Sequence, residues 1–198
     1  MNYSKEEMYL MEKDTLLKTI ILKNEHLKLR KPTRTYYDSM INLVISQFIS
    51  TSAALSISNK LLSSFDSELF TEDNFKNLKL IDIQQLGLSK NKSKSILEIT
   101  HHFINLDFIK KLNTLSEKEF DEYFLSIYGV GPWSLNMFKL FSLGKKDIFS
   151  SHDAALRKAM VINNMVNQHA KSDDYDSYST LWKPFRSIAC LHLWKSLD

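Results

Sequence analysis

Apolar residues recur at intervals of three and four positions along most of the chain, which is the spacing of one face of an α-helix. No segment shows the strict alternation of apolar and polar residues that marks a half-buried strand. The pattern predicts an all-α protein of about ten helices, with a break at residues 30–35 and a loop or the start of a helix at 173–178. The clearest helices are expected at residues 4–24, 36–48, 50–61, 80–86, 89–103, 116–127, 132–144, 153–162 and 184–194.

Particular residue types mark the helix ends. The segments Ser4–Glu7 and Ser116–Glu119 each place a serine three residues before a glutamate, which is the capping-box signature of a helix start. Pro132 is tolerated in the first turn of a helix, whereas Gly87 and Gly144 fit the position just after a helix end. These residues support the predicted boundaries.

Composition narrows the class of protein. The 198 residues include only four Gly and three Pro, against average usage of about 7% and about 5%, so collagen-like, linker-rich and turn-rich β architectures are excluded. No apolar run approaches the roughly 20 residues of a membrane helix, and the polar N-terminus is unlike a signal peptide. The single cysteine, Cys190, excludes an internal disulfide and a four-cysteine zinc or iron–sulfur centre. We expect an intracellular, cytoplasmic protein with no membrane partner, in which Cys190 is a small core residue.

A pair of glycines lies between two of the predicted helices. In Gly129–Pro132 the glycines permit backbone angles that other residues avoid, and they leave no side chain between the turn and a partner. Such a helix–hairpin–helix unit can bind DNA phosphates through backbone N–H groups, without reading the base sequence. An ordinary tight turn would have the same pattern. The stretches 139–158 and 89–94 are locally basic, although a charge run is also typical of a solvated helix face.

Residues 36–196 resemble, in five ordered blocks, the helix–hairpin–helix DNA glycosylases, and among them the 3-methyladenine DNA glycosylase II type. The strongest blocks are the hairpin, Leu125–Ser134, and the segment Asp147–Lys158, which follows the pattern Asp-Val-Phe-x-x-x-Asp-x-x-Leu-Arg-Lys. The other blocks are residues 46–54, 86–94 and 182–194. The resemblance implies two helical lobes with an active-site cleft between them. Within a single domain, 1–198, we expect lobe one at 36–112 and lobe two at 113–198 together with the N-terminal helices in 1–35.

The sequence departs from the family pattern at three positions. Phe48 replaces a second Gln, Ser150 stands where Pro is common, and Met137 replaces an aromatic residue. The first 35 residues are too short for the extra N-terminal domain of some members, so the resemblance implies a minimal form. These departures leave the preferred lesion less defined than the reaction.

The resemblance implies hydrolysis of the N-glycosidic bond of an alkylated purine, such as 3-methyladenine. Asp153 follows Trp133 by 20 residues, the family's spacing between hairpin and catalytic aspartate. A carboxylate there can stabilise the developing oxocarbenium charge and activate the attacking water, although Asp153 alone would be read as a helix N-cap. Strand-cleaving members carry a Schiff-base Lys where this chain has Trp133. The implied enzyme is therefore a monofunctional glycosylase of base-excision repair that leaves an abasic site and has no lyase activity.

Further residues take roles from the resemblance, with core packing as the alternative for each aromatic. The substrate-binding residues would be Trp133, Met137, Trp194 and Tyr36, around a flipped, cationic base. The DNA-binding residues would be Gln47, Phe48, Gly129, Val130, Gly131, Pro132, Ser134 and Lys94. Either Gln47 or Phe48 would be the wedge that fills the gap left by the base. The backbone carbonyls of Leu125, Ile127 and Val130 would hold a sodium or potassium ion when DNA is bound; no zinc, iron–sulfur cluster or other cofactor is implied.

Two other functions stay open. The chain could be a non-catalytic helix–hairpin–helix DNA-binding protein, or a glycosylase for a deaminated or oxidised base. The expected partner is double-stranded DNA containing damaged bases, bound by a monomer. Arg186 also has two open roles, which are a DNA contact and a brace between the C-terminal helices.

Overall fold

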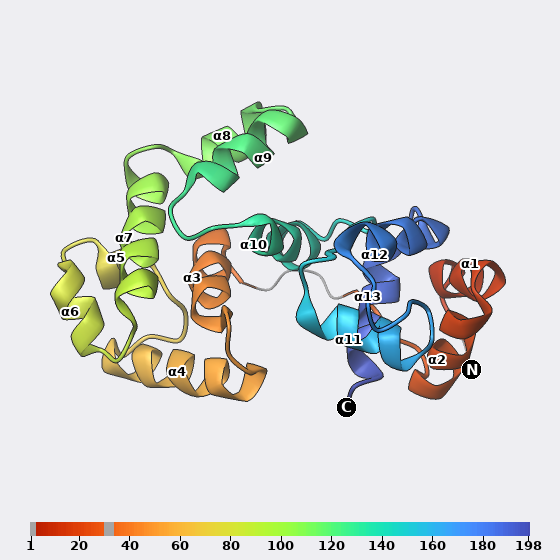
Figure 1. The fold of residues 1–198 in the computed structure, drawn as a ribbon. Coiled ribbons are helices and arrows are strands. Elements are labelled where there is room, and N and C mark those ends of the chain that lie inside the picture. Colours follow the sequence, from red (N-terminus) through yellow and green to blue (C-terminus); the bar gives the residue numbers. More distant parts are fainter. Residues whose placement is uncertain (1–2, 30–33) are drawn as a thin grey trace. The chain divides into compact units, whose positions relative to one another are not determined.

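The computed structural model describes residues 3–29 and 34–198 (Figure 1). Within these ranges the chain forms thirteen α-helices, one π-helical turn and one 3₁₀ turn, with no strand, as the apolar pattern predicts. The predicted break at 30–35 lies mostly outside the described residues. No helix in the described ranges is long and apolar enough to cross a membrane. The chain divides into two compact units, unit one with Met1–Pro32 and Lys139–Asp198 and unit two with Thr33–Phe138.

Unit one is built around its C-terminal helix. Its elements are α1 (Lys5–Lys13), α2 (Thr15–Asn24), α11 (Ala154–Ile162), α12 (Ser172–Ser179), the 3₁₀ turn η2 (Thr180–Trp182) and α13 (Arg186–Lys195). Helix α13 packs against α1, α2 and α11, and Leu10, Leu17, Leu156 and Leu193 are fully buried in this core. The π-helical turn η1 (Phe138–Ser142) begins at the last residue of unit two and continues into unit one.

Unit two is built around a long helix, α7. Its elements are α3 (Tyr36–Ser46), α4 (Thr51–Ser64), α5 (Glu72–Phe75), α6 (Leu80–Gln85), α7 (Lys90–Ile104), α8 (Phe108–Thr114), α9 (Glu117–Ser126) and α10 (Pro132–Met137). Helix α7 packs against α3, α5, α6 and α8, while α10 packs against α3 and α9 (Figure 1).

The division between the units falls at residue 138, whereas the sequence placed the lobe boundary near residue 112. An aromatic cluster explains the difference. Phe108 on α8 contacts the rings of Phe120 and Phe124 on α9, and Phe124 in turn contacts Phe138. These contacts hold residues 113–138 in unit two.

The helix predicted at residues 4–24 is interrupted at Asp14. The Asp14 carboxylate accepts the N–H groups of Leu16 and Leu17 at 2.8 and 3.0 Å, and it accepts the indole N–H of buried Trp182 at 2.8 Å. Asp14 therefore ends α1 and caps α2. The apolar spacing continues across this break, so the periodicity alone predicts one helix.

Other helix boundaries also differ from the prediction. Helix α3 ends at Ser46, before Phe48; α4 extends to Ser64; the helix after Pro132 becomes π-helical at Phe138; and α13 begins at Arg186, two residues after Pro184. The polar stretch at 173–178 lies in α12, while the short helices α5 and α8 were not expected. Both capping boxes are present, and Gly87 and Gly144 adopt positive φ angles after helix ends.

Candidate active site and DNA-binding hairpin

Asp153 is the N-cap of α11 and is only 7% exposed. Its Oδ1 accepts the backbone N–H of Leu156 at 2.8 Å and the indole N–H of Trp194 at 3.1 Å. The N–H of Asp153 in turn donates to the Ser150 carbonyl at 3.0 Å. The residue therefore does have the capping role that its type alone suggests, and the same contacts fix the orientation of its carboxylate.

Trp194 joins α13 to this carboxylate. The side chain is half-buried, and its ring stacks on Phe141 with centroids 5.7 Å apart and planes inclined by 27°. Phe141 lies in the π-helical turn η1 and is 47% exposed. The sequence pattern predicts that Phe141 is an apolar position of a regular helix. Nothing in the pattern indicates the π-helical turn in which the residue lies.

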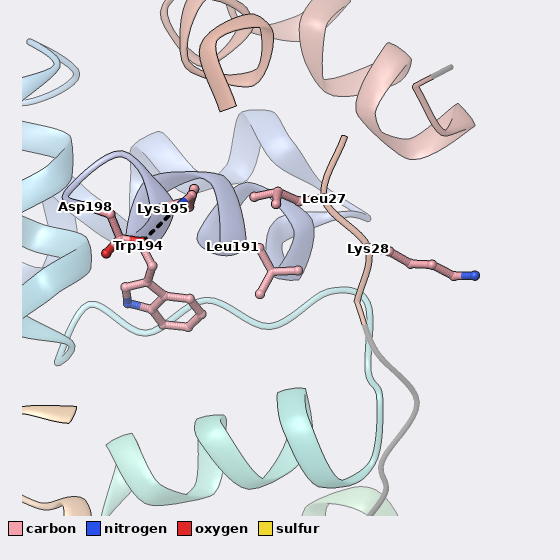
Figure 2. Close-up of a pocket in the computed structure, with 6 residues that line it drawn as sticks. All are labelled: Leu27, Lys28, Leu191, Trp194, Lys195 and Asp198. Atoms are coloured by element: carbon pink, nitrogen blue, oxygen red, sulfur yellow. Dashed lines mark hydrogen bonds and ion pairs between the residues drawn. The ribbon is translucent and has the colours of Figure 1, made fainter. Parts of the chain in front are cut away.

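A shallow hollow of about 270 Å³ lies beside Trp194. It is lined by Leu27, Lys28, Leu191, Trp194, Lys195 and Asp198 (Figure 2). Lys195 donates to Asp198 at 3.1 Å, whereas the Lys28 side chain extends away from the other lining residues (Figure 2). The segment after α2 therefore forms one wall of the surface next to Trp194.

Arg186 braces the loop that leads to Asp153. Its guanidinium donates to both carboxylate oxygens of Asp147, at 2.7 and 3.1 Å, and to the Asp147 carbonyl at 3.1 Å. The neighbouring Ser187 hydroxyl donates to the Lys145 carbonyl at 2.6 Å and accepts the Ile148 N–H at 3.0 Å. Of the two roles open to Arg186, the structure therefore displays the bracing one. Cys190, on the same helix, is buried as predicted, and burial raises the pKa of its thiol.

The hairpin lies in unit two, between α9 and α10. Gly129 has φ +79°, a region that side chains other than glycine rarely adopt, and a Cβ built on it would lie 1.8 Å from the Ser95 hydroxyl oxygen. The Val130 N–H donates to the Ile127 carbonyl at 3.1 Å, and Gly131 caps α10. The turn is therefore pressed closely against α7.

Gln47 holds the hairpin from the other side. Its side-chain N–H₂ group donates to the Gly129 carbonyl at 2.9 Å and to the Ser134 hydroxyl at 3.1 Å. The Ser134 side chain is buried, and its role in DNA binding stays a prediction. Phe48, the next residue after Gln47, has φ +61° and is fully exposed. The alternative of a core Phe48 within a helix is wrong, because α3 ends before it.

Two lysines at the start of α7 also contact residues near the hairpin and α3. The ammonium of Lys94 lies 3.7 Å from the ring centroid of Tyr128, which precedes the hairpin glycines. Lys92 donates to the Ile45 carbonyl at 2.7 Å, and burial lowers its pKa. Lys94 therefore stays exposed beside the hairpin, while Lys92 ties α7 to the end of α3.

The expected substrate-binding residues of unit two differ in their accessibility. Trp133 and Tyr36 are half-buried, and the Tyr36 ring lies 5.7 Å from that of Phe138. Met137 is only 3% exposed, so it packs in the core and offers little surface to a base. The structure therefore brings Asp153 and Trp194 together in unit one, and it gathers the hairpin, Gln47 and Lys94 in unit two.

Within the described part of the chain, no group of three or more His, Cys, Asp or Glu side chains could hold a metal ion.

A Gly-Val-Gly hairpin between two helices is the feature that identifies the helix–hairpin–helix class of DNA-binding proteins, and unit two carries it between α9 and α10. The HhH-GPD superfamily base excision DNA repair protein family matches residues 41–186, and the chain belongs to this family.

Related proteins and solved structures agree with this assignment. The alkylbase DNA glycosidase-like protein mag2 of Schizosaccharomyces pombe is 27% identical over 168 residues, which cover 83% of this chain and 79% of that protein. The DNA-3-methyladenine glycosylase of Saccharomyces cerevisiae is 25% identical over 230 residues, covering 94% and 77%. The structure of the Schizosaccharomyces pombe 3-methyladenine DNA glycosylase in complex with abasic DNA matches with a TM-score of 0.86 and 24% identity, over 98% of this chain and 96% of that one.

Proposed function

We propose that the protein is a monofunctional DNA glycosylase that removes alkylated purines, such as 3-methyladenine, from duplex DNA and leaves an abasic site. The observation that carries the proposal is the Asp153 carboxylate, held at the start of α11 by Leu156 and Trp194. Relatives named 3-methyladenine and alkylbase DNA glycosylases support the substrate class. The protein acts where its substrate is, in association with the nucleoid in the cytoplasm of a bacterium or in the nucleus of a eukaryote.

The reaction breaks the bond between C1′ and the base nitrogen, and the electron pair leaves with the base. Positive charge develops on the sugar, and the negative charge of Asp153 stabilises it most in the transition state. Water then adds to C1′, and the carboxylate accepts the proton that the water loses. Because Leu156 and Trp194 fix one carboxylate oxygen in advance, little reorganisation is needed when the charge appears.

DNA binding is assigned to the hairpin face of unit two. Backbone groups of Gly129, Val130 and Gly131 contact phosphates, and exposed Lys94 adds a positive charge beside them. Phe48 is the wedge, because it is the fully exposed neighbour of Gln47, whose own side chain is engaged by the hairpin. An apolar ring inserted into the stack fills the space of the flipped base.

An alkali ion at the hairpin is compatible with the donors present. The three carbonyls assigned to it belong to Leu125, Ile127 and Val130, and hard backbone oxygens suit such a cation. The Ile127 carbonyl accepts one hydrogen bond, from Val130, and retains a second lone pair. The Gly129 carbonyl, which is not in this set, is the one that Gln47 occupies. A bound cation would add positive charge next to a DNA phosphate.

The decisive experiment compares base release by the wild type and by Asp153→Asn on methylated duplex DNA. Asn caps a helix about as well as Asp, so the variant keeps its fold and its DNA affinity while single-turnover release falls by about 100-fold or more. A matched control is Asp107→Asn, which changes the capping aspartate of α8, whose Oδ1 accepts the Lys110 N–H; it should release base at the wild-type rate.

Equal release by the wild type and Asp153→Asn would contradict the catalytic role. If neither protein released any base while both bound DNA, the chain would be a non-catalytic binding protein. Release of only a deaminated or oxidised base from a lesion panel would assign the other substrate class. Covalent trapping on DNA by borohydride would contradict the absence of lyase activity, since it requires a Schiff base.

A further inference from the structure

A short turn, residues 150–153, leads into the helix that Asp153 caps. The N–H of Asp153 donates to the Ser150 carbonyl at 3.0 Å and closes this turn, while His152 is exposed at its tip. The hydrogen bonds to the carboxylate fix one of its oxygens, whereas the path of the turn determines where the Asp153 backbone lies. A displacement of the turn would therefore move the reacting group as well.

The two serines of this turn differ in how their side chains are held. The Ser150 hydroxyl is buried and has no hydrogen-bond partner within the described part of the chain. The Ser151 hydroxyl, in a residue only 4% exposed, donates to Asp176 Oδ2 at 2.8 Å. A carboxylate accepts a stronger hydrogen bond than a neutral oxygen does. The turn is therefore tied through Ser151 to α12, an element that has no role in the reaction described so far.

Helix α12 offers Asp176 as an acceptor with a fixed position. The preceding residue, Tyr175, is only 2% exposed and belongs to the core of unit one, and Ser179 is fully buried. The guanidinium of Arg157, on α11, also lies 4.9 Å from the centroid of the Tyr175 ring. Neighbouring residues of α12 therefore contact both the turn before Asp153 and the helix after it.

We propose that Asp176 is a positioning residue for base release, which holds the turn 150–153 through Ser151 and so keeps the Asp153 carboxylate aligned with C1′ of the flipped nucleotide. The inference rests on the proposed function and deepens it, because it names an exposed residue on which the geometry of the reaction depends. Asp176 acts through Ser151 and does not itself touch the reacting atoms. A misplacement of about 1 Å at a reacting group can lower a rate by about 100-fold, so a small movement of the turn is sufficient.

Single-turnover base release from methylated duplex DNA, with protein in excess, measures this effect on the chemical step. Asp176→Ala removes the acceptor, and we expect the rate constant to fall by about tenfold, while the Kd for a duplex carrying an abasic site stays at the wild-type value. Asp176→Asn keeps an oxygen that can accept the Ser151 hydroxyl, so it should retain the wild-type rate. Ser151→Ala should show the same loss as Asp176→Ala, and the double variant should be no slower than either single variant.

The matched control is Asp173→Ala, which removes the same charge from an exposed position of the same helix and should leave the rate unchanged. A wild-type rate in Asp176→Ala would overturn the proposal. Equal losses in Asp176→Asn and Asp176→Ala would overturn it too, because the charge and not the hydrogen bond would then matter. Losses that add in the double variant would show that the two residues act independently.

Hydrogen exchange of the Asp153 amide, followed by NMR, tests the same contact without any reaction. This N–H exchanges when the turn opens, because it donates to the Ser150 carbonyl. Exchange should be about tenfold faster in Asp176→Ala and unchanged in Asp176→Asn and Asp173→Ala. Unchanged exchange in Asp176→Ala would contradict the inference even where base is released. If the wild type released no base although exchange changed as expected, the proposed function would fail and the link between Ser151 and Asp176 would be a structural contact only.

Discussion

At the scale of single residues, Asp153 combines a structural and a chemical task. An N-cap carboxylate is attracted to the N–H groups of the first helical turn, which are the positive end of the helix dipole. One of these groups, the Leu156 N–H, donates to the same oxygen that Trp194 contacts. The reacting group is therefore fixed by the start of a helix and by a side chain from another helix, so its geometry does not depend on a mobile loop.

Trp194→Phe tests the second of these supports. The variant keeps an aromatic ring for the stack on Phe141 but removes the N–H that donates to Asp153. A hydrogen bond to a charged group contributes about 1.5–3 kcal/mol, so we expect single-turnover base release to fall by roughly ten- to 100-fold, with abasic-site affinity little changed. Release at the wild-type rate would show that Leu156 alone is sufficient to orient the carboxylate.

The sequence predicts Asp153 and Trp194 as site residues but not the bond between them. Both lie in recognisable motifs, whereas their contact depends on how α13 packs against α11, which a linear pattern does not record. Phe141 escapes prediction for a different reason. Its exposure depends on a π-helical turn, and the apolar spacing of residues 135–141 fits a regular helix equally well. The hydrogen bond from Gln47 to the buried Ser134 hydroxyl was not predicted either, because the two residues are far apart in the sequence.

At the scale of elements, the hairpin is held from two sides. Gln47 binds the Gly129 carbonyl from the end of α3, and Ser95 lies against the Gly129 backbone from α7. Lys92 joins α7 to α3 through the Ile45 carbonyl. These contacts connect the hairpin to the loop that carries Phe48 within unit two. The proposed phosphate-binding groups and the proposed wedge are therefore held at a fixed distance from each other.

Gly129→Ala should disrupt this bracing. The new Cβ would approach the Ser95 hydroxyl to 1.8 Å, and alanine would have to adopt φ +79°. Strain of this kind costs about 1–3 kcal/mol, so we expect a lower midpoint in urea unfolding and weaker DNA binding. Gly131→Ala is the matched control, because a Cβ at Gly131 meets nothing within 4 Å and its φ is −118°. Equal losses of stability in the two variants would contradict the role of Ser95.

Among the elements, the long amphipathic helices were predictable and the interruptions were not. The predicted capping boxes are present at the starts of α1 and α9, and Gly87 follows the end of α6 as predicted. Asp14 was missed because the apolar spacing continues across it, although its carboxylate caps α2 and also accepts the indole N–H of Trp182, which is far away in the sequence. Helices α5 and α8 are too short to establish a period.

At the scale of the whole molecule, the two ends of the chain are joined within unit one by a buried carboxylate. Glu7 on α1 accepts hydrogen bonds from the backbone of Leu27 at 2.8 Å and contacts His26 Nδ1 at 2.6 Å and His192 Nε2 at 3.1 Å. Asn24 also donates to the His192 carbonyl at 2.7 Å. The N-terminal segment is therefore bound to α13, the helix that carries Trp194.

The cluster of Glu7, His26 and His192 predicts that the free energy of unfolding falls on acidification. Burial lowers the pKa of His192 below the ordinary 6.5, although Glu7 opposes the shift. His192 therefore takes up a proton more readily when unfolded, and the free energy of unfolding should fall as pH drops below about 6.5, by up to about 1.4 kcal/mol per pH unit. Burial raises the pKa of Glu7, but hydrogen bonds from Ser4, Leu27 and His26 outweigh it and leave the pKa below 4.5. The free energy of unfolding should therefore fall further as the pH drops below about 4.5 and Glu7 takes up a proton more readily in the unfolded chain.

Urea unfolding at pH 7.5 and 5.0 checks this expectation. His192→Gln keeps a side-chain donor without a titrating group, so its stability should change less between the two pH values. Burial also lowers the pKa of His102 in unit two, so this residue too should make the free energy of unfolding fall on acidification. The variant His102→Gln measures how much of the pH dependence comes from His102. An undiminished pH dependence in His192→Gln would assign the effect to other groups.

The capping role of Asp153 has a consequence for how chains of this kind diverge. Selection for folding alone accepts Asn at this position as readily as Asp, since both cap a helix about equally well. Selection for catalysis accepts only the carboxylate. Related chains that have lost the reaction but kept the fold should therefore drift to Asn here before they drift to Ala, and the choice between Asp and Asn at this one site would separate working enzymes from inactive descendants.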